Sequence, residues 1–516
     1  MAFTLQRVLI SDNVSSKCAE LLQSHGITVE TKTKLSKEEL IAEIPNYDGL
    51  IVRSATKVTS DVINAASNLK IIGRAGTGVD NIDIPAASKK GIVVMNTPGG
   101  NTLSAVEHTC AMVSCIARHI PQAHRSLKEG RWDRKDYMGT ELAGKTLAII
   151  GLGRIGRDVA KRMQSFEMTT IGFDPLVSPE ESAEFGVEWL PVDQIWPRAD
   201  YITVHTPLIP QTRGLLGDSS FPLCKKGVRV VNVARGGIID EAALVKALES
   251  GQCGGAALDV FMEEPPTNAA LIQNSKVICT PHLGASTSEA QTRVAVEIAQ
   301  QFVDAVQGKS LFGAINAHAL SNALKPETKP VVALGEALGV LISGLSSQPQ
   351  KQVCVTTCGQ TMADTKKFIG DAVTCGVLRR HATSSLNLVN ASLYAKELGV
   401  EVKTTHEDGP RGLLRVTAGS VTLVGQVQGS HPVLLEINGQ SFGAGVGLVG
   451  SLVFYVSSEP LKHLAELAGG LENNNQVIAF ATTNSSVDQW NVAKLVQPTA
   501  NLGGFEKRIC SFFTTF

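Results

Sequence analysis

The sequence predicts an α/β protein with two doubly wound parallel sheets, followed by two smaller α+β modules. Three observations lead to this fold class. Short apolar runs alternate with helical patterns over roughly the first hundred residues, a glycine-rich turn joins an apolar strand to a helix near Gly151, and the chain becomes rich in valine, threonine and glycine beyond Ala317. Strands that alternate with helices are typical of parallel sheets with helices on both faces.

The first segment of the chain is expected to form one of the two parallel sheets. The amphipathic stretch Lys37–Glu43 predicts a helix, and longer helices are predicted over residues 101–120 and 287–306. Four apolar runs predict the strands of this sheet: Arg7–Ser11, Gly49–Arg53, Lys70–Gly73 and Ile92–Met95.

The turn Gly151-Leu-Gly153-Arg-Ile-Gly156 has the spacing of a dinucleotide-binding turn. It follows a predicted strand at 146–150 and leads into a predicted helix at 157–163, as such a site requires. Gly151 permits the tight turn, Gly153 lets a pyrophosphate approach the backbone, and Gly156 lets the helix pack on the strand. The unpaired N–H groups at the start of the helix would face the phosphates. We therefore expect the second sheet to be Rossmann-like.

An acidic residue follows the next predicted strand, Thr169–Phe173, about 20 residues beyond the glycines. This residue, Asp174, can accept hydrogen bonds from the adenosine ribose hydroxyls and would repel a 2′-phosphate. The expected cofactor is therefore NAD and not NADP.

Length, charge and cysteine content exclude several classes of protein. The 516 residues suffice for three or four domains, and the formal net charge of −1, without a long basic run, predicts no nucleic-acid partner. The N-terminal segment does not have the pattern of a signal peptide, and no apolar stretch approaches the roughly 20 residues that cross a bilayer, so no membrane partner is expected. Ten cysteines are scattered without a CxxC pair, which predicts reduced thiols, a cytoplasmic location and no metal site.

The chain beyond the two parallel sheets is expected to form two regulatory modules. Residues 325–330 predict a linker, and the modules are expected over 331–450 and 451–516. The last module is predicted to have the order strand, helix, strand, strand, helix. Its elements are expected at Leu452–Val456, from Pro460, at Val477–Phe480, at Trp490–Ala493 and near Phe505.

Several motifs occur in one order along the first three-fifths or so of the chain, to about residue 320. Besides the glycine turn they are Val52–Thr56, Gly73–Asn81, Met95–Pro98, Val231–Gly237, Asp259–Pro265 and Pro281–Thr287. On these motifs the chain resembles the D-isomer-specific 2-hydroxyacid dehydrogenases, in particular the vertebrate-type members that act on 3-phospho-D-glycerate.

Within this resemblance three residues would carry the chemistry. His282 is suited to take the proton from the C2 hydroxyl of a 2-hydroxy acid, because imidazole titrates near neutral pH. Glu264 would orient the imidazole and stabilise its protonated form, and Glu263 is the weaker candidate because the family motif places the acid immediately before proline. Arg235 presents a planar fork that suits the substrate carboxylate and the C2 oxygen. Each residue alone could equally be a turn or loop residue, but their joint order favours catalysis.

The resemblance also implies binding residues. Cofactor contacts are implied for Thr77, Gly151, Gly153, Arg154, Ile155, Gly156, Asp174, Thr206, Val233, Ala234, Arg235, Asp259, His282, Gly284 and Ala285. Substrate contacts are implied for Arg53, Ser54, Ala55, Arg74, Gly76 and Gly78, with Arg134 or Lys135 reaching from a partner subunit. Residues 131–135 could equally be an exposed charged loop, and Asp136 stands where another basic residue is expected.

The βαβ rhythm before the glycine turn and the two long predicted helices further predict a division into domains. A discontinuous substrate domain would comprise residues 1–98 and 288–316, around an NAD-binding domain at 99–287. The module at 331–450 would follow, and the module at 451–516 resembles an ACT module.

The implied reaction is the NAD-dependent oxidation of 3-phospho-D-glycerate to 3-phosphohydroxypyruvate, the first step of the phosphorylated L-serine pathway. Two alternatives stay open. One is a hydroxypyruvate or glyoxylate reductase, against which the arginines expected at the phosphate argue. The other is an NAD-sensing scaffold that resembles the C-terminal binding protein corepressors, which lack two further modules after the catalytic unit.

The expected partners are the small-molecule substrate and further copies of the chain. The apolar helix near 106–116 and the loop that carries Arg134 predict a homodimer or a homotetramer. An ACT-like module suggests feedback by serine. However, Ser457–Pro460 stands where the binding loop would carry Asn or His, so a module that only mediates oligomerisation is equally expected.

Overall fold

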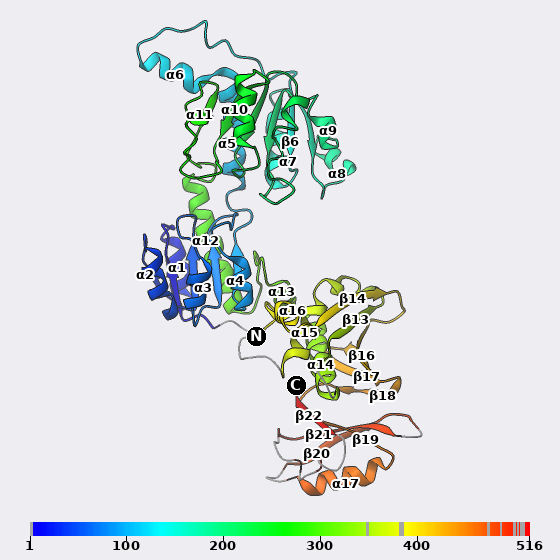
Figure 1. Cartoon of the computed structure of the whole chain (residues 1–516). Helices are drawn as coiled ribbons and strands as arrows, with labels where there is room; N and C mark the ends of the chain where they lie inside the picture. The colour runs from blue at the N-terminus through cyan, green and yellow to red at the C-terminus, as the bar shows by residue number, and fades with distance from the viewer. Residues whose placement is uncertain are drawn as a thin grey trace. The chain divides into compact units, whose positions relative to one another are not determined.

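The computed structural model describes residues 4–346, 350–380, 386–471, 475–485, 488–498, 502, 505 and 511–516. Two compact units divide the chain: unit 1 comprises residues 1–96 and 298–516, and unit 2 comprises residues 97–297. Figure 1 shows their elements, coloured from the N-terminus to the C-terminus.

The first sheet of unit 1 has five parallel strands in the order β2-β1-β3-β4-β5. The strand order reverses between β1 and β3, because β2 lies on one side of this pair and β4 and β5 lie on the other. In open parallel sheets, ligands bind beyond the carboxyl ends of the strands at such a reversal. Asp12 and Arg53 lie just beyond the ends of these two strands. The strands are β1 Arg7–Ile10, β2 Thr28–Thr31, β3 Gly49–Val52, β4 Ile71–Arg74 and β5 Val93–Asn96.

Helices cover both faces of this sheet, as the class requires. On one face Leu50 and Ile72 join a buried core with Val62. On the other face a side chain at Gly73 would collide with Phe302, which belongs to the helix α12. The glycine therefore lets α12 approach the sheet closely. The helices of this part are α1 Lys17–Ser24, α2 Lys37–Glu43, α3 Ser60–Ala65, α4 Ile84–Lys89 and α12 Ser288–Val306, the last of which crosses the boundary between the units.

Unit 2 contains a seven-stranded parallel sheet in the order β12-β11-β10-β9-β6-β7-β8. The order reverses between β6 and β9. The strands are β6 Thr146–Ile150, β7 Thr169–Phe173, β8 Glu188–Trp189, β9 Tyr201–Val204, β10 Val228–Asn232, β11 Cys253–Leu258 and β12 Val277–Cys279.

The residues of β6 alternate between two cores, which confirms the doubly wound arrangement. Ala148 and Ile150 face the helix α10, whereas Leu147 and Ile149 face α5 and α7. The apolar face of α5, which includes Val106 and Ile116, is therefore buried within its own unit. The helices are α5 Thr102–Arg118, α6 Ile120–Lys128, α7 Arg154–Gln164, α8 Pro179–Glu184, α9 Val192–Ile195, α10 Glu241–Glu249 and α11 Ala269–Ile272.

Two further sheets follow in unit 1, as the sequence predicts. A six-stranded mixed sheet has the order β14-β13-β15-β16-β17-β18, in which only β13 and β14 are parallel, and a four-stranded antiparallel sheet has the order β20-β21-β19-β22. Their strands are β13 Gln352–Cys358, β14 Glu401–Glu407, β15 Leu413–Ala418, β16 Val421–Gln428, β17 His431–Ile437, β18 Gln440–Gly447, β19 Ser451–Ser457, β20 Val477–Thr482, β21 Gln489–Leu495 and β22 Ser511–Thr515.

The core of the six-stranded sheet is shared with the last sheet. The helices α14 and α15 pack on the six-stranded sheet, and Phe454 and Phe512 from the four-stranded sheet join the same core. The opposite face of the four-stranded sheet packs against α17, with Val453 and Leu467 in contact. The helices are α13 His318–Leu324, α14 Lys329–Leu345, α15 Ile369–Leu378, α16 Ala391–Glu397 and α17 Pro460–Gly470.

The structure departs from the predicted elements in three places. The strand β2 was not predicted, because this half-exposed edge strand, Thr-Val-Glu-Thr, needs no apolar run. The expected linker 325–330 is shorter, since Lys329 and Pro330 already form the first turn of α14. The last described element is the strand β22 paired with β19, while most residues of the helix expected near Phe505 lie outside the described part of the chain.

No single described helix is long and apolar enough to cross a membrane. The helices α13 and α14 reach the length and apolar composition of a membrane span only when they are taken together. They are bent by 119° with respect to each other. Most of the apolar residues of α14 are buried in the core of the six-stranded sheet.

Candidate active site

The glycine turn lies at the reversal of the seven-stranded sheet, between the carboxyl end of β6 and the first turn of α7. Gly151 has φ +99°, and a Cβ there would lie 2.6 Å from the carbonyl oxygen of His205. A Cβ at Gly156 would overlap the Gly151 carbonyl, whereas a Cβ at Gly153 would meet nothing within 4 Å. Two glycines are thus required by packing, and the third leaves open space beside the start of α7, where Arg154 and Ile155 form the first turn.

The carboxylate of Asp174 is fixed beside this turn. It accepts hydrogen bonds from the backbone N–H of Leu152 at 2.9 Å and of Leu176 at 2.9 Å. Each bond uses a different carboxylate oxygen, and an oxygen of a carboxylate can accept more than one hydrogen bond. The side chain therefore retains acceptor capacity for a ligand hydroxyl next to the glycines.

The neighbouring strand β9 brings two polar residues to the same edge. Burial lowers the pKa of His205 to about 4, so its imidazole is neutral at physiological pH. The hydroxyl of Thr206 is buried and has no hydrogen-bond partner among the described residues. An unpaired buried hydroxyl is costly, so this position suits a polar ligand group.

His282 and Glu264 form the pair that the motifs predict. Nδ1 of His282 lies 2.8 Å from Oε2 of Glu264, and both side chains are partly exposed, by 46% and 38%. The other oxygen of Glu264 accepts a hydrogen bond from the backbone N–H of Phe261 at 3.2 Å. This second bond fixes the carboxylate, so the imidazole presents Nε2 on its opposite side. Glu263 instead accepts a hydrogen bond from Thr267.

A buried carboxylate supports the turn that carries His282. Asp259 is fully buried, and it accepts hydrogen bonds from the backbone N–H groups of Leu283 at 2.7 Å and Gly284 at 2.8 Å. The Thr280 hydroxyl donates to it at 2.6 Å, and His108 lies 3.3 Å away. Burial opposes the ionisation of Asp259, but the hydrogen bonds from His108, Thr280 and the backbone hold its pKa below the usual range.

This support is needed because His282 has a left-handed backbone, with φ +55°. A non-glycine residue adopts this conformation only where the surroundings impose it. Asp259 therefore positions His282 through the hydrogen bonds that it accepts from the turn. At the end of the turn, the Ala285 carbonyl accepts a further hydrogen bond from the Gln291 side chain.

Arg235 lies in a turn that Asn232 closes at the end of β10. The Asn232 side chain accepts a hydrogen bond from Ala234 N–H at 2.9 Å and donates one to the Arg235 carbonyl at 2.8 Å. The Arg235 guanidinium in turn donates to the Ala234 carbonyl at 2.7 Å. Val233 lies between Asn232 and Ala234, directly after the end of β10.

The second group of predicted residues lies at the carboxyl edge of the five-stranded sheet in unit 1. Asp12 organises this edge by accepting hydrogen bonds from Arg53 N–H at 2.5 Å and from Thr56, whose hydroxyl donates at 2.8 Å. Asn81 donates to the Arg53 carbonyl at 2.6 Å. Ser54 and Ala55 are exposed between these anchors. The loop is therefore held at both ends, with its middle open to solvent.

Two arginines share this edge because β3 and β4 are neighbours in register, with Val52 opposite Arg74. The Arg53 guanidinium donates to the Asn13 carbonyl at 3.2 Å, and burial lowers its pKa while Asp12 opposes that change. A Cβ at Gly76 would overlap the Arg74 guanidinium, so Gly76 leaves room for that side chain. Thr77 and Gly78 continue the same loop, in which the Thr77 carbonyl accepts a hydrogen bond from Asn96.

Arg134 and Lys135 lie in unit 2, in the exposed segment between α6 and β6. Neither forms an ion pair with a described residue, whereas Arg131 pairs with Glu129 and Asp133. The structure does not bring Arg134 and Lys135 together with the other predicted residues of their own unit.

Several supporting residues were not predicted from the sequence. They are Asp12, His108, Asn232 and Thr280. Asn232 had a detectable signal, since Asn commonly bonds the backbone two residues further on. Asp12 and His108 act on segments at least 40 residues away, and only the fold reveals such contacts.

Comparisons with known proteins agree with this geometry. Residues 110–284 match the family described as D-isomer specific 2-hydroxyacid dehydrogenase, NAD binding domain, and residues 327–430 match the D-3-phosphoglycerate dehydrogenase intervening domain. The chain is 51% identical to the D-3-phosphoglycerate dehydrogenase of Rattus norvegicus, over 99% of both chains, and equally similar to that of Homo sapiens. It is 45% identical to the Bacillus subtilis enzyme of the same name, over 76% of this chain and 75% of that one.

Solved structures similar to this chain include a glyoxylate reductase and a D-lactate dehydrogenase. A glyoxylate reductase from Paecilomyes thermophila covers 61% of this chain and is itself covered to 99%, with a TM-score of 0.56 and 27% identity. A D-lactate dehydrogenase from Aquifex aeolicus, complexed with NAD and lactic acid, covers 59% of this chain and is covered to 96%, with a TM-score of 0.54 and 25% identity.

Proposed function

Because the chain belongs to the D-3-phosphoglycerate dehydrogenase family, we propose that it oxidises 3-phospho-D-glycerate to 3-phosphohydroxypyruvate with NAD, the first step of L-serine synthesis. The observation that carries the proposal is the His282–Glu264 hydrogen bond of 2.8 Å. It supplies a base held in one orientation by an acid, which the oxidation of a secondary alcohol needs.

Three residues have distinct roles in the proposed reaction. Nε2 of His282 accepts the proton of the C2 hydroxyl, and Glu264 stabilises the imidazolium through Nδ1–H. The guanidinium of Arg235 binds the substrate carboxylate and the C2 oxygen, whose charge changes as the carbonyl forms. Bound at the glycine turn, NAD would supply the acceptor for the hydride that C2 loses.

The residues around the glycine turn fit this cofactor. Gly153 leaves space at the start of α7 for the pyrophosphate, and Asp174 has acceptor capacity for the adenosine ribose. The unpaired Thr206 hydroxyl provides a further polar contact. The other cofactor contacts implied by the family motifs, including Thr77, Val233 and Ala285, stay predictions.

We assign the substrate phosphate to Arg53 and Arg74. A phosphate carries nearly two negative charges at neutral pH, and two guanidinium groups at the carboxyl ends of the neighbouring strands β3 and β4 can bind it with several charge-assisted hydrogen bonds. Backbone groups of Ser54, Ala55, Gly76 and Gly78 are assigned to the substrate carboxylate. Arg134 and Lys135 remain proposed contacts from a partner subunit.

The proposed domains are residues 1–98 with 288–316, residues 99–287, residues 331–450 and residues 451–516. Each of the four sheets lies within one of these domains, which supports the division. A cytoplasmic location remains a prediction from the scattered cysteines.

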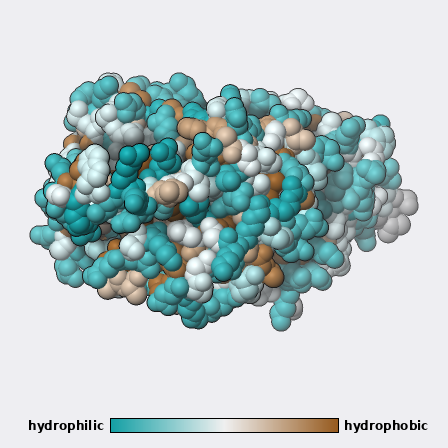
Figure 2. Space-filling model, turned by 90° about the horizontal axis from the view of Figure 1, so that it is seen from above, coloured by the Kyte–Doolittle hydropathy of each residue, from teal (hydrophilic) through white to brown (hydrophobic). Residues whose placement is uncertain are grey.

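We also propose that the chain forms a homodimer through the segment around α6, with a homotetramer as the larger form. Trp132 and Met138 are 80% and 83% exposed, and Leu127 on α6 is 57% exposed. We assign the contact to this segment because Val106 and Ile116, on the apolar face of α5, are already buried in their own unit. On the face drawn in Figure 2 the hydrophobic residues form small patches in a mostly hydrophilic surface. Exposed aromatic residues among polar ones are typical of subunit interfaces.

The test of the reaction is NADH formation by the purified protein with 3-phosphoglycerate and NAD at alkaline pH. We expect NADH to form with 3-phosphoglycerate as the substrate. Activity with hydroxypyruvate or glyoxylate but none with 3-phosphoglycerate would make the protein a reductase. NAD binding without turnover of any of these acids would favour a scaffold.

A further inference from the structure

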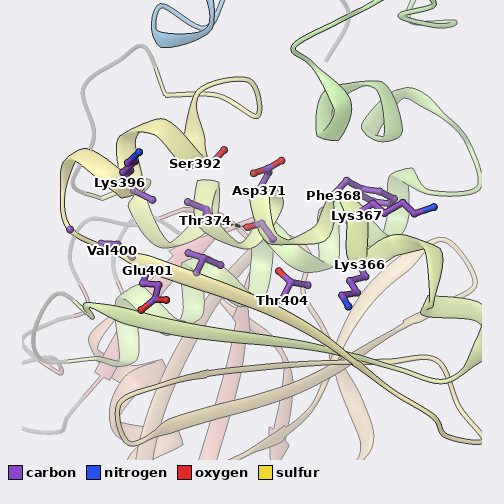
Figure 3. Close-up of a pocket in the computed structure, with 14 residues that line it drawn as sticks. Lys366, Lys367, Phe368, Asp371, Thr374, Ser392, Lys396, Val400, Glu401 and Thr404 are labelled. Atoms are coloured by element: carbon purple, nitrogen blue, oxygen red, sulfur yellow. Dashed lines mark hydrogen bonds between the residues drawn. The ribbon is translucent and has the colours of Figure 1, made fainter. Parts of the chain in front are cut away.

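A cavity of about 530 Å³ lies in the part of unit 1 that carries the six-stranded sheet, in the segment matched to the intervening domain. The helices α15 and α16 form one side of it and the strand β14 the other (Figure 3). None of its lining residues belongs to the proposed active site. The proposed reaction therefore leaves this cavity without a role.

Three polar side chains of the lining come from its two sides. In Figure 3 Asp371 on α15 and Ser392 on α16 lie next to each other, and Thr404 on β14 lies on the opposite side. Burial raises the pKa of the Asp371 carboxyl, and the Ser392 hydroxyl and the His318 imidazole only partly offset this. Asp371 makes no ion pair within the described part of the chain. A half-buried carboxyl of this kind is stabilised by a ligand cation.

Space for a ligand is created by Gly370 and Thr374. A Cβ at Gly370 would lie 2.7 Å from the Thr404 hydroxyl, so any larger residue would fill the cavity there. The Thr374 hydroxyl donates to the Gly370 carbonyl at 2.7 Å and is thereby directed to the helix backbone. The uncharged polar and acidic side chains left for a ligand are Asp371, Ser392, Thr404 and Glu401, the last of which lies at the start of β14.

The lining also carries positive charge. Lys366 and Lys396 form no ion pair with any residue that the structure describes, while Lys367 is paired with Asp364 at 3.5 Å. Lys366 lies near Thr404 in Figure 3. The cavity thus offers a carboxylate and an ammonium group that do not neutralise each other, an arrangement that suits a ligand with both charges.

We propose that this cavity binds a small zwitterion of the α-amino acid class, with the ligand ammonium group at Asp371 and Ser392 and the ligand carboxylate at Lys366. The carboxylate of Asp371 selects the ammonium group, and the side chain of the amino acid occupies the space bounded by Phe368 and Val402.

Binding here would act on the sheet that carries Arg53 and Arg74. Asn390, just before α16, donates to the Lys89 carbonyl at 3.3 Å, and Asn387 donates to the Gly91 carbonyl at 3.1 Å. Glu397 at the end of α16 pairs with the Lys89 ammonium at 2.5 Å. A ligand that holds Ser392 therefore holds a helix that is bonded to the turn between α4 and β5.

The test is calorimetric titration of the full-length protein with L-serine, L-alanine and glycine, and with propionate, ethylamine and inorganic phosphate as single-charge probes. Saturable binding of at least one amino acid is expected, with the single-charge probes at least about tenfold weaker. Phosphate or propionate binding as tightly as the best amino acid would overturn the proposal.

Variants locate the site. Asp371→Asn is expected to weaken amino-acid binding at least about tenfold and Ser392→Ala severalfold, while Asp408→Asn, at an exposed carboxylate outside the cavity lining, should change nothing. Ser392 is exposed, so its variant tests the site even if Asp371→Asn fails to fold. Unchanged binding in both folded variants would place any amino-acid site elsewhere and refute the proposal.

Discussion

The Nδ1 atom of His282 lies 2.8 Å from Oε2 of Glu264, and these residues reach each other from different loops at one edge of the seven-stranded sheet. The turn after β11 supplies the acid and the turn after β12 supplies the base. Hydrogen bonds to neighbouring groups fix both residues. The Asp259 carboxylate accepts one from the backbone N–H of Leu283, next to His282, and the Glu264 carboxylate accepts one from the Phe261 N–H.

Replacing Glu264 by Gln should lower kcat by about a hundredfold, because the amide can still orient the imidazole but cannot stabilise its protonated form. The measurement is the rate of NADH formation over a range of pH. The matched control is Glu263→Gln, whose carboxylate bonds Thr267 and not His282. An equal loss of rate in the two variants would contradict the assignment of the acid.

Replacing Asp259 by Asn should lower the free energy of unfolding by about 1–3 kcal/mol, because a buried acceptor of four groups loses its charge and one acceptor position. The pKa of Asp259 is lower in the folded state, so its contribution is present above the pKa of the unfolded chain, near 4, and is lost as pH falls through the folded pKa. The difference between wild type and variant in urea unfolding should therefore shrink below about pH 4. A difference that does not change with pH would contradict the charged role.

Two glycines of the turn should respond differently to the same substitution. Gly156→Ala should destabilise the fold, because its Cβ would overlap the Gly151 carbonyl. Gly153→Ala should leave the unfolding temperature unchanged and weaken NAD binding about tenfold or more, because its methyl group enters the space assigned to the pyrophosphate. Thermal unfolding and fluorescence titration with NADH measure the two effects. Normal NADH affinity in Gly153→Ala would refute the placement of the pyrophosphate.

Replacing Arg53 by Ala should raise KM for 3-phosphoglycerate about ten- to a hundredfold, the loss expected for charge-assisted hydrogen bonds. The reduction of hydroxypyruvate, which lacks the phosphate, should change much less. Steady-state kinetics with both substrates make the comparison within one protein. An equal loss with both substrates would move Arg53 from the phosphate to the carboxylate or to the fold.

Replacing Trp132 by Ser should raise the dissociation constant of the dimer at least about tenfold, because an exposed aromatic side chain at an interface contributes much of its binding energy. Light scattering at several concentrations measures the equilibrium. The control is Leu223→Ser, another exposed apolar residue of unit 2, at 55%. A wild-type protein that stays monomeric throughout would contradict the dimer itself.

Local sequence determined the elements that bind the cofactor. The strand β6, the glycine turn, the helix α7 and Asp174 were predicted because apolar runs, glycine spacing and an acid after a strand act over a few residues. The same holds for the helix α5 as an element. It does not hold for the packing of its apolar face, because only the fold shows that Val106 and Ile116 join the core of their own unit.

Only the tertiary structure decided how these elements support one another. Asp259 lies 24 residues from Leu283 and more than 100 residues from His108, and Asp12 lies 41 residues from Arg53. The strand β22 pairs with β19 across some 60 residues, and β2 completes its sheet without an apolar run. The sequence by itself specified which residues could do the chemistry, because their type and spacing are local. Folding decided which of them meet, because hydrogen bonds and sheet pairing between distant segments depend on the positions of strands that no local pattern records.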